Sequence, residues 1–401
     1  MERINWNSGR MIRSGPPTAL LLLALLASAC AEGDPAARRA ARAARTKGDI
    51  LVGAGGPWSS PDGEAAWRGL KIALDEINSN GGIGGRKLRI AKLDDEGSVD
   101  GGRTAAQAFA DDPDMVAVIG HFDSHISVPN SIVYEYNGML MLSPFSTAPK
   151  LTRQGFRRIF RMVPDDTAFG SRLARFAVSR GLERVMIYQV QNEYGTGLAN
   201  AFERECEVLG ISVPDRLSYD SRSDERIFRR DLSFWKENFE FDGMLVAGSV
   251  PQAALFVREA RGLGIRASIL AGDGLDTPEF ASLAGESAEG VFVGSVSSPD
   301  DERPEAAEFA AGYSRKYGAP PDTNAARLYD AVRLLASAIK ESGSAVPDRI
   351  AGSLRSMAAW TGAAGDYRFG ADGNLSDRDI LIKVVRGGKL VPFRRLLEEN
   401  E

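Results

Sequence analysis

The chain has 401 residues, of which 43% are hydrophobic and 26% are charged, and its formal net charge at pH 7 is −5. This length favours two domains over one, and this composition is typical of a soluble globular protein rather than a disordered or membrane-embedded one. The negative charge, with no basic stripe in the folded region, argues against a nucleic-acid partner.

The N-terminal segment predicts export from the cytoplasm. Arg10 and Arg13 precede an apolar run of eleven residues at 19–29. Such a run cannot span about 30 Å of hydrocarbon as a helix, so a secretory signal is favoured. The run ends in Ala27–Ser28–Ala29–Cys30, which is similar to a lipobox with Ala where Leu is usual. We expect residues 1–29 to be removed and Cys30 to be lipidated, with plain cleavage after Ala29 as the alternative.

The next segment is compositionally simple. Residues 31–47 are rich in Ala and Arg and have no apolar face, which favours a flexible tether over residues 30–48. If Cys30 is acylated, Cys206 is the only cysteine left, so no internal disulfide is expected. Cys206 lies in an expected helix and is predicted to be a buried, inert thiol.

Residues 49–54 predict the first strand of the folded region, and the loop Gly55–Ser60 follows it. Trp58 in this loop is either an exposed loop aromatic or a ring that overhangs the mouth of a cleft. A helix pattern from Trp67 to Ile77 ends at Asn80–Gly81–Gly82. These glycines predict turns rather than a phosphate site, because no strand–GxGxxG–helix order is present.

The stretch 115–152 predicts a strand–helix–strand unit with a polar loop after each strand. The strands are expected at 115–119 and 139–142, and apolar residues recur at near-helical spacing between them. The loops are His121–Ser124 and Ser143–Thr147. In open α/β sheets ligands bind beside the carboxyl ends of the strands, and hydroxyls, amides and a helix N-terminus there suit a small anion.

A second alternation of strands and helices follows and predicts a second parallel, doubly wound sheet. Strands are expected at 160–164, 185–189, 211–219, 243–247, 268–271 and 292–293. Helices at 305–317 and 324–341 would complete the first lobe, and the alternation around Gly387–Gly388 predicts a hairpin over 380–393.

Several segments closely resemble the bacterial leucine–isoleucine–valine-binding proteins: IGHFDS, SIVYEYNGMLMLSP, STAPKLT and DEINSNGGIGGRKLRI. That family comprises type I periplasmic binding proteins that serve ABC importers. The resemblance implies an α/β fold with two doubly wound parallel-sheet lobes joined by a three-strand hinge. It implies that residues 49–164 plus 297–375 form lobe 1, and that residues 165–296 plus 376–401 form lobe 2.

The resemblance also implies a binding site for an amino acid. In the family a GH-x-x-S loop and a P-x-x-T-A-P-x-L-T loop hold the ligand carboxylate, which implies this role for Ser124 and Thr147; helix capping or turn hydrogen bonding is the alternative for both. Asp273 matches an acid, usually glutamate, that pairs with the ammonium group. Asp is one methylene shorter, so either the lobes close further or a water bridges the gap. The alternative is a turn aspartate between glycines.

Three further residues match family positions around the ligand. Tyr194 matches a tyrosine that packs on the ligand from the second lobe. Ser249 stands where a second tyrosine is common, and Phe145 stands where a small residue is common, whose carbonyl accepts from the ammonium. These departures put the side-chain specificity in doubt, so leucine is not implied as the ligand.

His121 and His125 are the only histidines, and Asp123 lies between them. No metal site is expected, because such a pair must lie wholly on a helix to converge and no third ligand is nearby. No cofactor is expected. No Cys–His or Ser–His–acid arrangement is evident, so an enzyme is not expected either.

The sequence therefore predicts an extracytoplasmic solute-binding protein, monomeric and lipid-anchored at Cys30, in the periplasm or on the cell-envelope surface. It would capture a small amino acid, branched-chain type or related, by lobe closure and deliver it to an ABC permease. The alternatives are a ligand sensor or regulatory binding protein of the same fold, an amide- or urea-like solute, or an envelope scaffold without a ligand.

Overall fold

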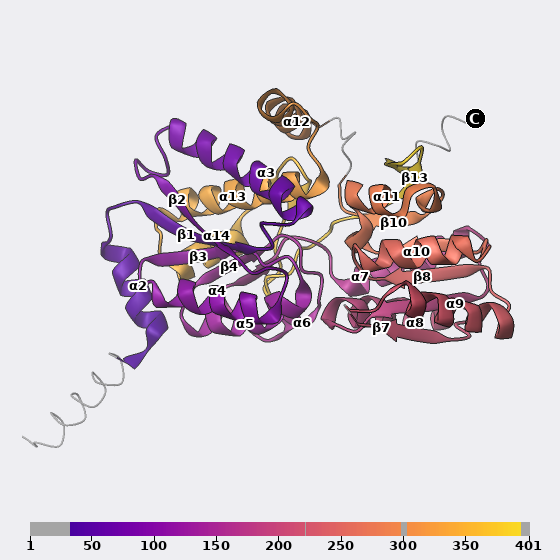
Figure 1. Ribbon diagram of the computed structural model, residues 1–401. Coiled ribbons are helices and arrows are strands. Elements are labelled where there is room, and N and C mark those ends of the chain that lie inside the picture. Colours follow the sequence, from indigo (N-terminus) through magenta and orange to yellow (C-terminus); the bar gives the residue numbers. More distant parts are fainter. Residues whose placement is uncertain (1–32, 221, 298–302, 394–401) are drawn as a thin grey trace, which may run out of the picture.

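The computed structural model describes residues 33–220, 222–297 and 303–393 of the chain. The predicted signal peptide and the predicted lipidation at Cys30 lie outside these residues. The described elements form two α/β lobes that lie side by side, each built around its own sheet (Figure 1). Among the helices of these residues, none combines the length and apolarity needed to cross a membrane.

Lobe 1 contains a five-stranded parallel sheet in the order β2-β1-β3-β4-β5. Every residue of β3 and β4 is buried, which explains why β3 is a continuous apolar run and why β4 is apolar up to Ser143. Helices pack on both faces of the sheet, with α3, α13 and α14 over one face and α4 and α5 over the other. The strands are β1 (Ile50–Gly56), β2 (Leu88–Asp94), β3 (Met115–Ile119), β4 (Leu140–Ser143) and β5 (Ile159–Arg161), with the small pair β11 (Trp360–Thr361) and β12 (Asp366–Tyr367). The helices are α3 (Pro61–Ser79), α4 (Val99–Asp111), α5 (Ser124–Tyr136), α6 (Lys150–Arg153), α12 (Pro304–Tyr317), α13 (Thr323–Ser342) and α14 (Pro347–Ser356).

Lobe 2 contains a seven-stranded sheet in the order β14-β13-β10-β9-β8-β6-β7. Its strands β6 to β10 pair in parallel, and the predicted C-terminal hairpin β13–β14 adds two antiparallel strands at one edge. The strands are β6 (Val185–Val190), β7 (Arg216–Tyr219), β8 (Gly243–Ala247), β9 (Ser268–Ala271), β10 (Phe292–Ser295), β13 (Leu381–Arg386) and β14 (Lys389–Pro392). The helices are α7 (Asp166–Ser179), α8 (Glu193–Leu209), α9 (Glu225–Asn238), α10 (Gln252–Gly262) and α11 (Pro278–Ala284), with short 3-10 turns η1 (Asp273–Leu275) and η2 (Gly285–Ala288).

The chain passes between the lobes three times, as the predicted fold requires. The passages follow β5, follow β10 and precede β13. The expected strand at 160–164 is shorter than predicted, because β5 ends at Arg161 and the residues after it form the first passage. Cys206 is fully buried on α8, as predicted, and burial raises the pKa of its thiol to about 12.

The prediction of a flexible tether is wrong for residues 35–45, which form helix α2 (Pro35–Arg45) against lobe 1 (Figure 1). Arg39 is buried, and its guanidinium donates to the backbone carbonyls of Ala110, Asp112, Met115 and Asn137 at 2.6–2.7 Å. Three of these carbonyls belong to the C-terminal ends of α4 and α5, where carbonyl groups lack partners within the helix. Arg39 satisfies them, and this contact docks the helix.

Candidate functional site

Ser124 joins the two polar loops of lobe 1. It is the first residue of α5, and its Oγ accepts hydrogen bonds from the Ala148 amide at 3.2 Å and from the Ser146 hydroxyl at 3.1 Å. The N-cap of α5 is Asp123, so Ser124 does not serve as the N-cap of this helix. The side chain of Ser124 therefore fixes the loop after β4 against the start of α5.

Thr147 and Asp166 meet where lobe 1 adjoins the first helix of lobe 2. The Asp166 amide donates to the Thr147 carbonyl at 2.9 Å. The Thr147 side chain is almost fully buried and Asp166 is fully buried. The Thr147 hydroxyl and both Asp166 carboxylate oxygens have no hydrogen-bond partner among the described residues. Buried polar groups are normally paired, so this pair of side chains is suited to an external polar partner.

The environment of Asp166 favours a cation beside it. Burial raises the pKa of the Asp166 carboxyl well above its ordinary value; the nearby Thr147 hydroxyl opposes the shift, and the Asp273 carboxylate adds to it. A β-carbon at Gly197 of α8 would lie 2.3 Å from Asp166 Oδ2, so the glycine leaves room for this carboxylate. A positive charge at this point would lower the pKa and stabilise the ionised form.

Tyr194 and Asp273 lie together at the carboxyl ends of the lobe 2 strands. Tyr194 is on the first turn of α8, and its hydroxyl accepts from the Gly274 amide at 3.0 Å. A β-carbon at Gly272 would lie 2.5 Å from the Tyr194 hydroxyl, so this glycine permits the close approach. Burial raises the pKa of Asp273 to about 6, and the Arg327 guanidinium opposes this shift.

Arg327 of α13 reaches Asp273 across the interface between the lobes. Its Nη1 lies 3.5 Å from Asp273 Oδ2, and the two side chains are 5% and 8% exposed. Two further contacts cross the same interface. The Thr277 hydroxyl donates to Asp62 Oδ1 at 2.6 Å, and Lys383 Nζ, which binds Asp276 at 2.7 Å, lies 3.3 Å from the Thr323 hydroxyl. The lobes are thus in direct polar contact around the start of α13.

The remaining predicted residues lie at or behind this interface. Ser249 is half-buried in the loop after β8, where its carbonyl accepts from the Ala253 amide at 3.1 Å. Phe145 is buried, and its ring stacks on Phe122 with centroids 3.8 Å apart. Both expectations for Trp58 are wrong. Trp58 is a core residue that is 4% exposed, and its indole N–H donates to the Leu93 carbonyl at 2.8 Å.

His121 has a structural role between β2 and α5. Its Nδ1 lies 2.6 Å from Asp95 Oδ2, and its Nε2 lies 2.8 Å from the Tyr134 hydroxyl. All three side chains are fully buried. Within the described part of the chain, no group of three or more His, Cys, Asp or Glu side chains is placed to hold a metal ion.

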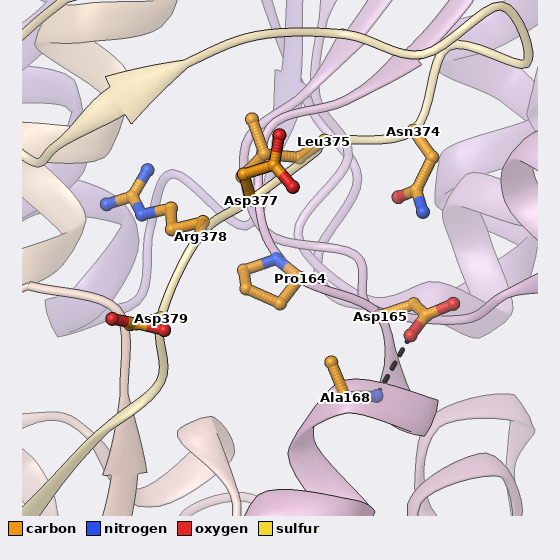
Figure 2. Close-up of a pocket in the computed structure, with 8 residues that line it drawn as sticks. All are labelled: Pro164, Asp165, Ala168, Asn374, Leu375, Asp377, Arg378 and Asp379. Carbon is orange, nitrogen blue, oxygen red and sulfur yellow. Dashed lines mark hydrogen bonds between the residues drawn. The ribbon is translucent and has the colours of Figure 1, made fainter.

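A cavity of about 430 Å³ lies at the hinge, on the first and third passages between the lobes. Figure 2 shows Asp165, Asp377, Arg378 and Asp379 around it, with Asp165 accepting from the Ala168 amide at the start of α7. The loops that carry Ser124 and Thr147 do not line this cavity. The cavity lies beside segments that must move if the lobes rotate. It is separate from the predicted ligand site.

Sequence reasoning missed two residues of the interface, Asp166 and Arg327. Asp166 gives no signal of a site in the sequence, because an acid in the first turn of a helix is explained by the helix dipole without a ligand. Arg327 carried a stronger signal. It lies in register with Ala331, Leu334 and Ala338 on a buried stripe of α13, where a charged residue needs an explanation.

Comparisons with known proteins agree with this architecture. Residues 50–389 match the model of a family described as "Periplasmic binding protein". The Leu/Ile/Val-binding protein homolog 1 of Brucella abortus is 30% identical over 333 residues, which cover 81% of this chain and 87% of that protein. An ABC transporter substrate-binding protein from Desulfitobacterium hafniense, solved in complex with Leu, is 35% identical, with a TM-score of 0.76 over 86% of this chain and 100% of its own. A leucine-binding protein from Thermotoga maritima is 29% identical, with a TM-score of 0.80 over 86% of this chain and 97% of its own.

Proposed function

This chain belongs to the periplasmic binding protein family, and from that premise we propose that it captures a small α-amino acid between its lobes and delivers it to an ABC permease. The role of solute-binding protein follows from the family. The proposal concerns the ligand, the residues that hold it and the anchoring of the protein.

One observation carries the choice of ligand. The unpaired Thr147 hydroxyl and the unpaired Asp166 carboxylate are buried next to each other, and Ser124 at the start of α5 contacts the amide of Ala148, the residue after Thr147. An amino-acid zwitterion supplies a carboxylate for the hydroxyls and for the N-terminus of α5, and an ammonium group for Asp166. We assign the ammonium to Asp166 rather than to Asp273, because Asp273 already has Arg327 as a counter-ion. Asp273 is nevertheless close enough for its negative charge to raise the pKa of Asp166.

The mechanism is closure without a chemical step. Lobe 1 supplies Ser124 and Thr147, while lobe 2 supplies Asp166, Tyr194 and Asp273. A ligand that contacts both groups binds the closed arrangement better than an open one, so it shifts the population towards closure. The closed molecule is then the form that the permease recognises. No residue of the site is assigned a catalytic role.

We further propose that Cys30 is lipidated after signal-peptide removal and that the protein works as a monomer on the outer face of the membrane. Residues 31–34 are all that separates Cys30 from α2. Five residue steps span at most about 18 Å of extended chain. Because Arg39 docks α2 on lobe 1, this short segment would keep lobe 1 close to the membrane and therefore close to the permease.

The test is a thermal-shift screen of the chain from Ala31 onward, which retains α2. The panel contains α-amino acids, short amides, urea and small carboxylates. An amino acid at 100 times its dissociation constant should add about 2.7 kcal/mol of stability. The Asp166→Ala variant should lose this effect. The Asp100→Ala variant, which removes an exposed first-turn acid from α4, should retain it. If only uncharged amides or urea stabilise the protein, the amino-acid proposal is wrong. If none of the compounds in the panel raises the melting temperature, the proposal is contradicted as well.

A further inference from the structure

A row of positively charged side chains lies along one edge of lobe 1, in a chain whose formal net charge is −5. Arg38 and Arg45 are on α2, seven residues apart and thus on one helix face, and both are exposed. The row continues through the residues that follow α2 and those that precede β2, because Arg86 Nε donates to the Gly48 carbonyl at 2.6 Å. We call this row the basic edge, and its members are Arg38, Arg45, Lys47, Arg86 and Lys87.

The charges of the basic edge are not neutralised by neighbouring acids. Among the described residues, no ion pair joins an acidic side chain to any of the five members. Arg86 and Lys87 donate to backbone carbonyls, which carry no net charge. The acids near them in the chain have other partners, which are the Ala36 amide for Asp34, Arg89 for Asp49, Arg39 for Asp112 and Arg42 for Asp114.

The charges on α2 are fixed to lobe 1 and are not carried on a loose segment. Arg39 binds four backbone carbonyls of the lobe, and Ala43 is buried in its core. Arg39 and Ala43 form the face of α2 that packs on the lobe, while Arg38 and Arg45 form a face that is exposed. A surface that attracts these exposed charges therefore orients the whole lobe, which a flexible basic segment would not do.

The basic edge and the predicted ligand loops lie at opposite ends of the same strands. Arg39 binds the carbonyls of Met115, the first residue of β3, and of Asn137, which precedes β4. Ser124 and Thr147 follow the other ends of these two strands. A strand rises by about 3.3 Å per residue, so the five residues of β3 span about 16 Å. Figure 1 likewise shows α2 at the end of lobe 1 that is far from lobe 2.

We propose that the basic edge docks on an anionic phospholipid bilayer and holds lobe 1 with its ligand loops facing away from the lipid. This inference goes beyond the proposed function and does not depend on which ligand is bound. A bilayer is chosen over other polyanions because residues 31–34 alone separate α2 from Cys30, the proposed lipidation site. An acyl chain and a basic patch act together in membrane anchoring. The acidic excess in the rest of the chain is repelled by the same surface, which reinforces the orientation.

Sedimentation with vesicles tests the docking on the chain from Ala31 onward, which contains every described residue and lacks Cys30. The vesicles contain equal parts of phosphatidylglycerol and phosphatidylcholine, and pure phosphatidylcholine vesicles are the comparison. The protein should bind the anionic vesicles at least about tenfold more tightly, because each basic residue near an anionic surface contributes roughly fivefold. Raising the salt from about 0.1 M to about 1 M shortens the Debye length from about 10 Å to about 3 Å and should release the protein.

Two matched triple variants locate the docking surface. The variant with Arg38→Gln, Arg45→Gln and Lys47→Gln should lose at least about tenfold in binding to anionic vesicles. The control removes the same charge from exposed positions of lobe 2 and should keep wild-type binding; it carries Arg204→Gln, Arg258→Gln and Arg266→Gln. An equal loss in both variants would mean that net charge rather than the basic edge decides binding, and it would overturn the proposal. Undiminished binding of the first variant, or equal binding of the wild type to both kinds of vesicle, would overturn it too.

Fluorescent labels test the orientation. Cys206 is buried, so a single new cysteine at an exposed position can be labelled selectively. Ala44→Cys places the label on α2, and Val208→Cys places it on lobe 2, where Val208 is 79% exposed. A quencher attached to the lipid headgroups should dim the first label and leave the second unchanged. Equal quenching of both labels, or no quenching of either, would contradict the proposed orientation. A ligand screen without any hit would refute the proposed function but would leave these vesicle results unaffected.

Discussion

The Nη1 atom of Arg327 and the Oδ2 atom of Asp273 lie 3.5 Å apart although they belong to different lobes. Arg327 is on α13 of lobe 1, and Asp273 begins η1 after β9 of lobe 2. The contact requires the lobes to be close together, so the ionisation of Asp273 is linked to closure. The carboxyl groups of Asp322 and Asp330 share its raised pKa of about 6, in each case chiefly because of burial.

These carboxyl groups predict how stability depends on pH. A carboxyl whose pKa is raised in the folded state binds its proton more tightly folded than unfolded, so its contribution to the free energy of unfolding falls as pH rises from about 4 to about 6. Asp322 is the N-cap of α13, and Asn caps helices equally well. The stability advantage of the wild type over Asp322→Asn should therefore shrink as pH rises through this window. Thermal unfolding at closely spaced pH values measures it, and a constant or growing difference would contradict the raised pKa.

Thr147→Val should separate stability from binding. The Thr147 hydroxyl is buried without a hydrogen-bond partner, so its removal should not destabilise the ligand-free protein, but it should weaken amino-acid binding about tenfold or more. Thr152→Val is the matched control. Thr152 is equally buried, but its hydroxyl accepts from Arg161 at 3.2 Å, so this variant should lose stability. Denaturant unfolding and calorimetry give both quantities, and a destabilised Thr147→Val variant with normal affinity would refute the assignment.

Gly197→Ala should displace the Asp166 carboxylate by placing a methyl group against it. The added β-carbon would lie 2.3 Å from Asp166 Oδ2, so the carboxylate must move away from the proposed ammonium position. We expect at least a tenfold loss of affinity, in keeping with a displaced charge-assisted contact. Gly352→Ala in α14, where nothing lies within 4 Å, should leave affinity unchanged and add about 1 kcal/mol of stability. Wild-type affinity in Gly197→Ala would show that Asp166 does not contact the ligand.

The docking of α2 predicts a pattern of proteolysis. This helix contains four arginines, so a flexible tether would be cut rapidly by trypsin, whereas a docked helix should resist. Arg39→Met removes the contacts to the ends of α4 and α5 and should expose the segment to cleavage at its remaining arginines. Arg38→Met, at an exposed position of the same helix, should stay protected. Mass spectrometry of the digests gives the result, and equal cleavage of the wild type and Arg39→Met would mean that α2 is not held by Arg39.

Much of the fold was predictable because its signals are local. The fully buried strands β3 and β8 are continuous runs without a polar side chain, and the hairpin β13–β14 is marked by its glycine turn. Ser124 and Thr147 were predicted as site residues because each follows a buried strand in a family-like loop, and the structure brings both loops together through the Ser124 hydroxyl. Their role as ligand contacts stays a prediction.

The features that the sequence did not predict share a physical cause. Each of these residues depends on contacts with residues that are far away in the sequence. Helix α2 has no apolar stripe of large side chains, because its docking depends mainly on Arg39 and Arg42 and on partners that lie 71–98 residues further along the chain. Trp58 follows a strand in a loop, and its burial depends on packing against Trp67 and Phe122. Asp166 and Arg327 look locally like ordinary helix residues, and their meaning depends on which groups face them across the lobes.

The most direct test of the central claim compares one molecule with and without its ammonium group. The amino acid that stabilises the protein most is titrated by calorimetry beside the corresponding acid that lacks the α-amino group. If Asp166 holds the ammonium, the deaminated acid should bind at least about 100-fold more weakly, because the carboxylate of Asp166 would be left buried without a partner. Equal affinity for the two compounds would contradict an amino-acid site at Thr147 and Asp166.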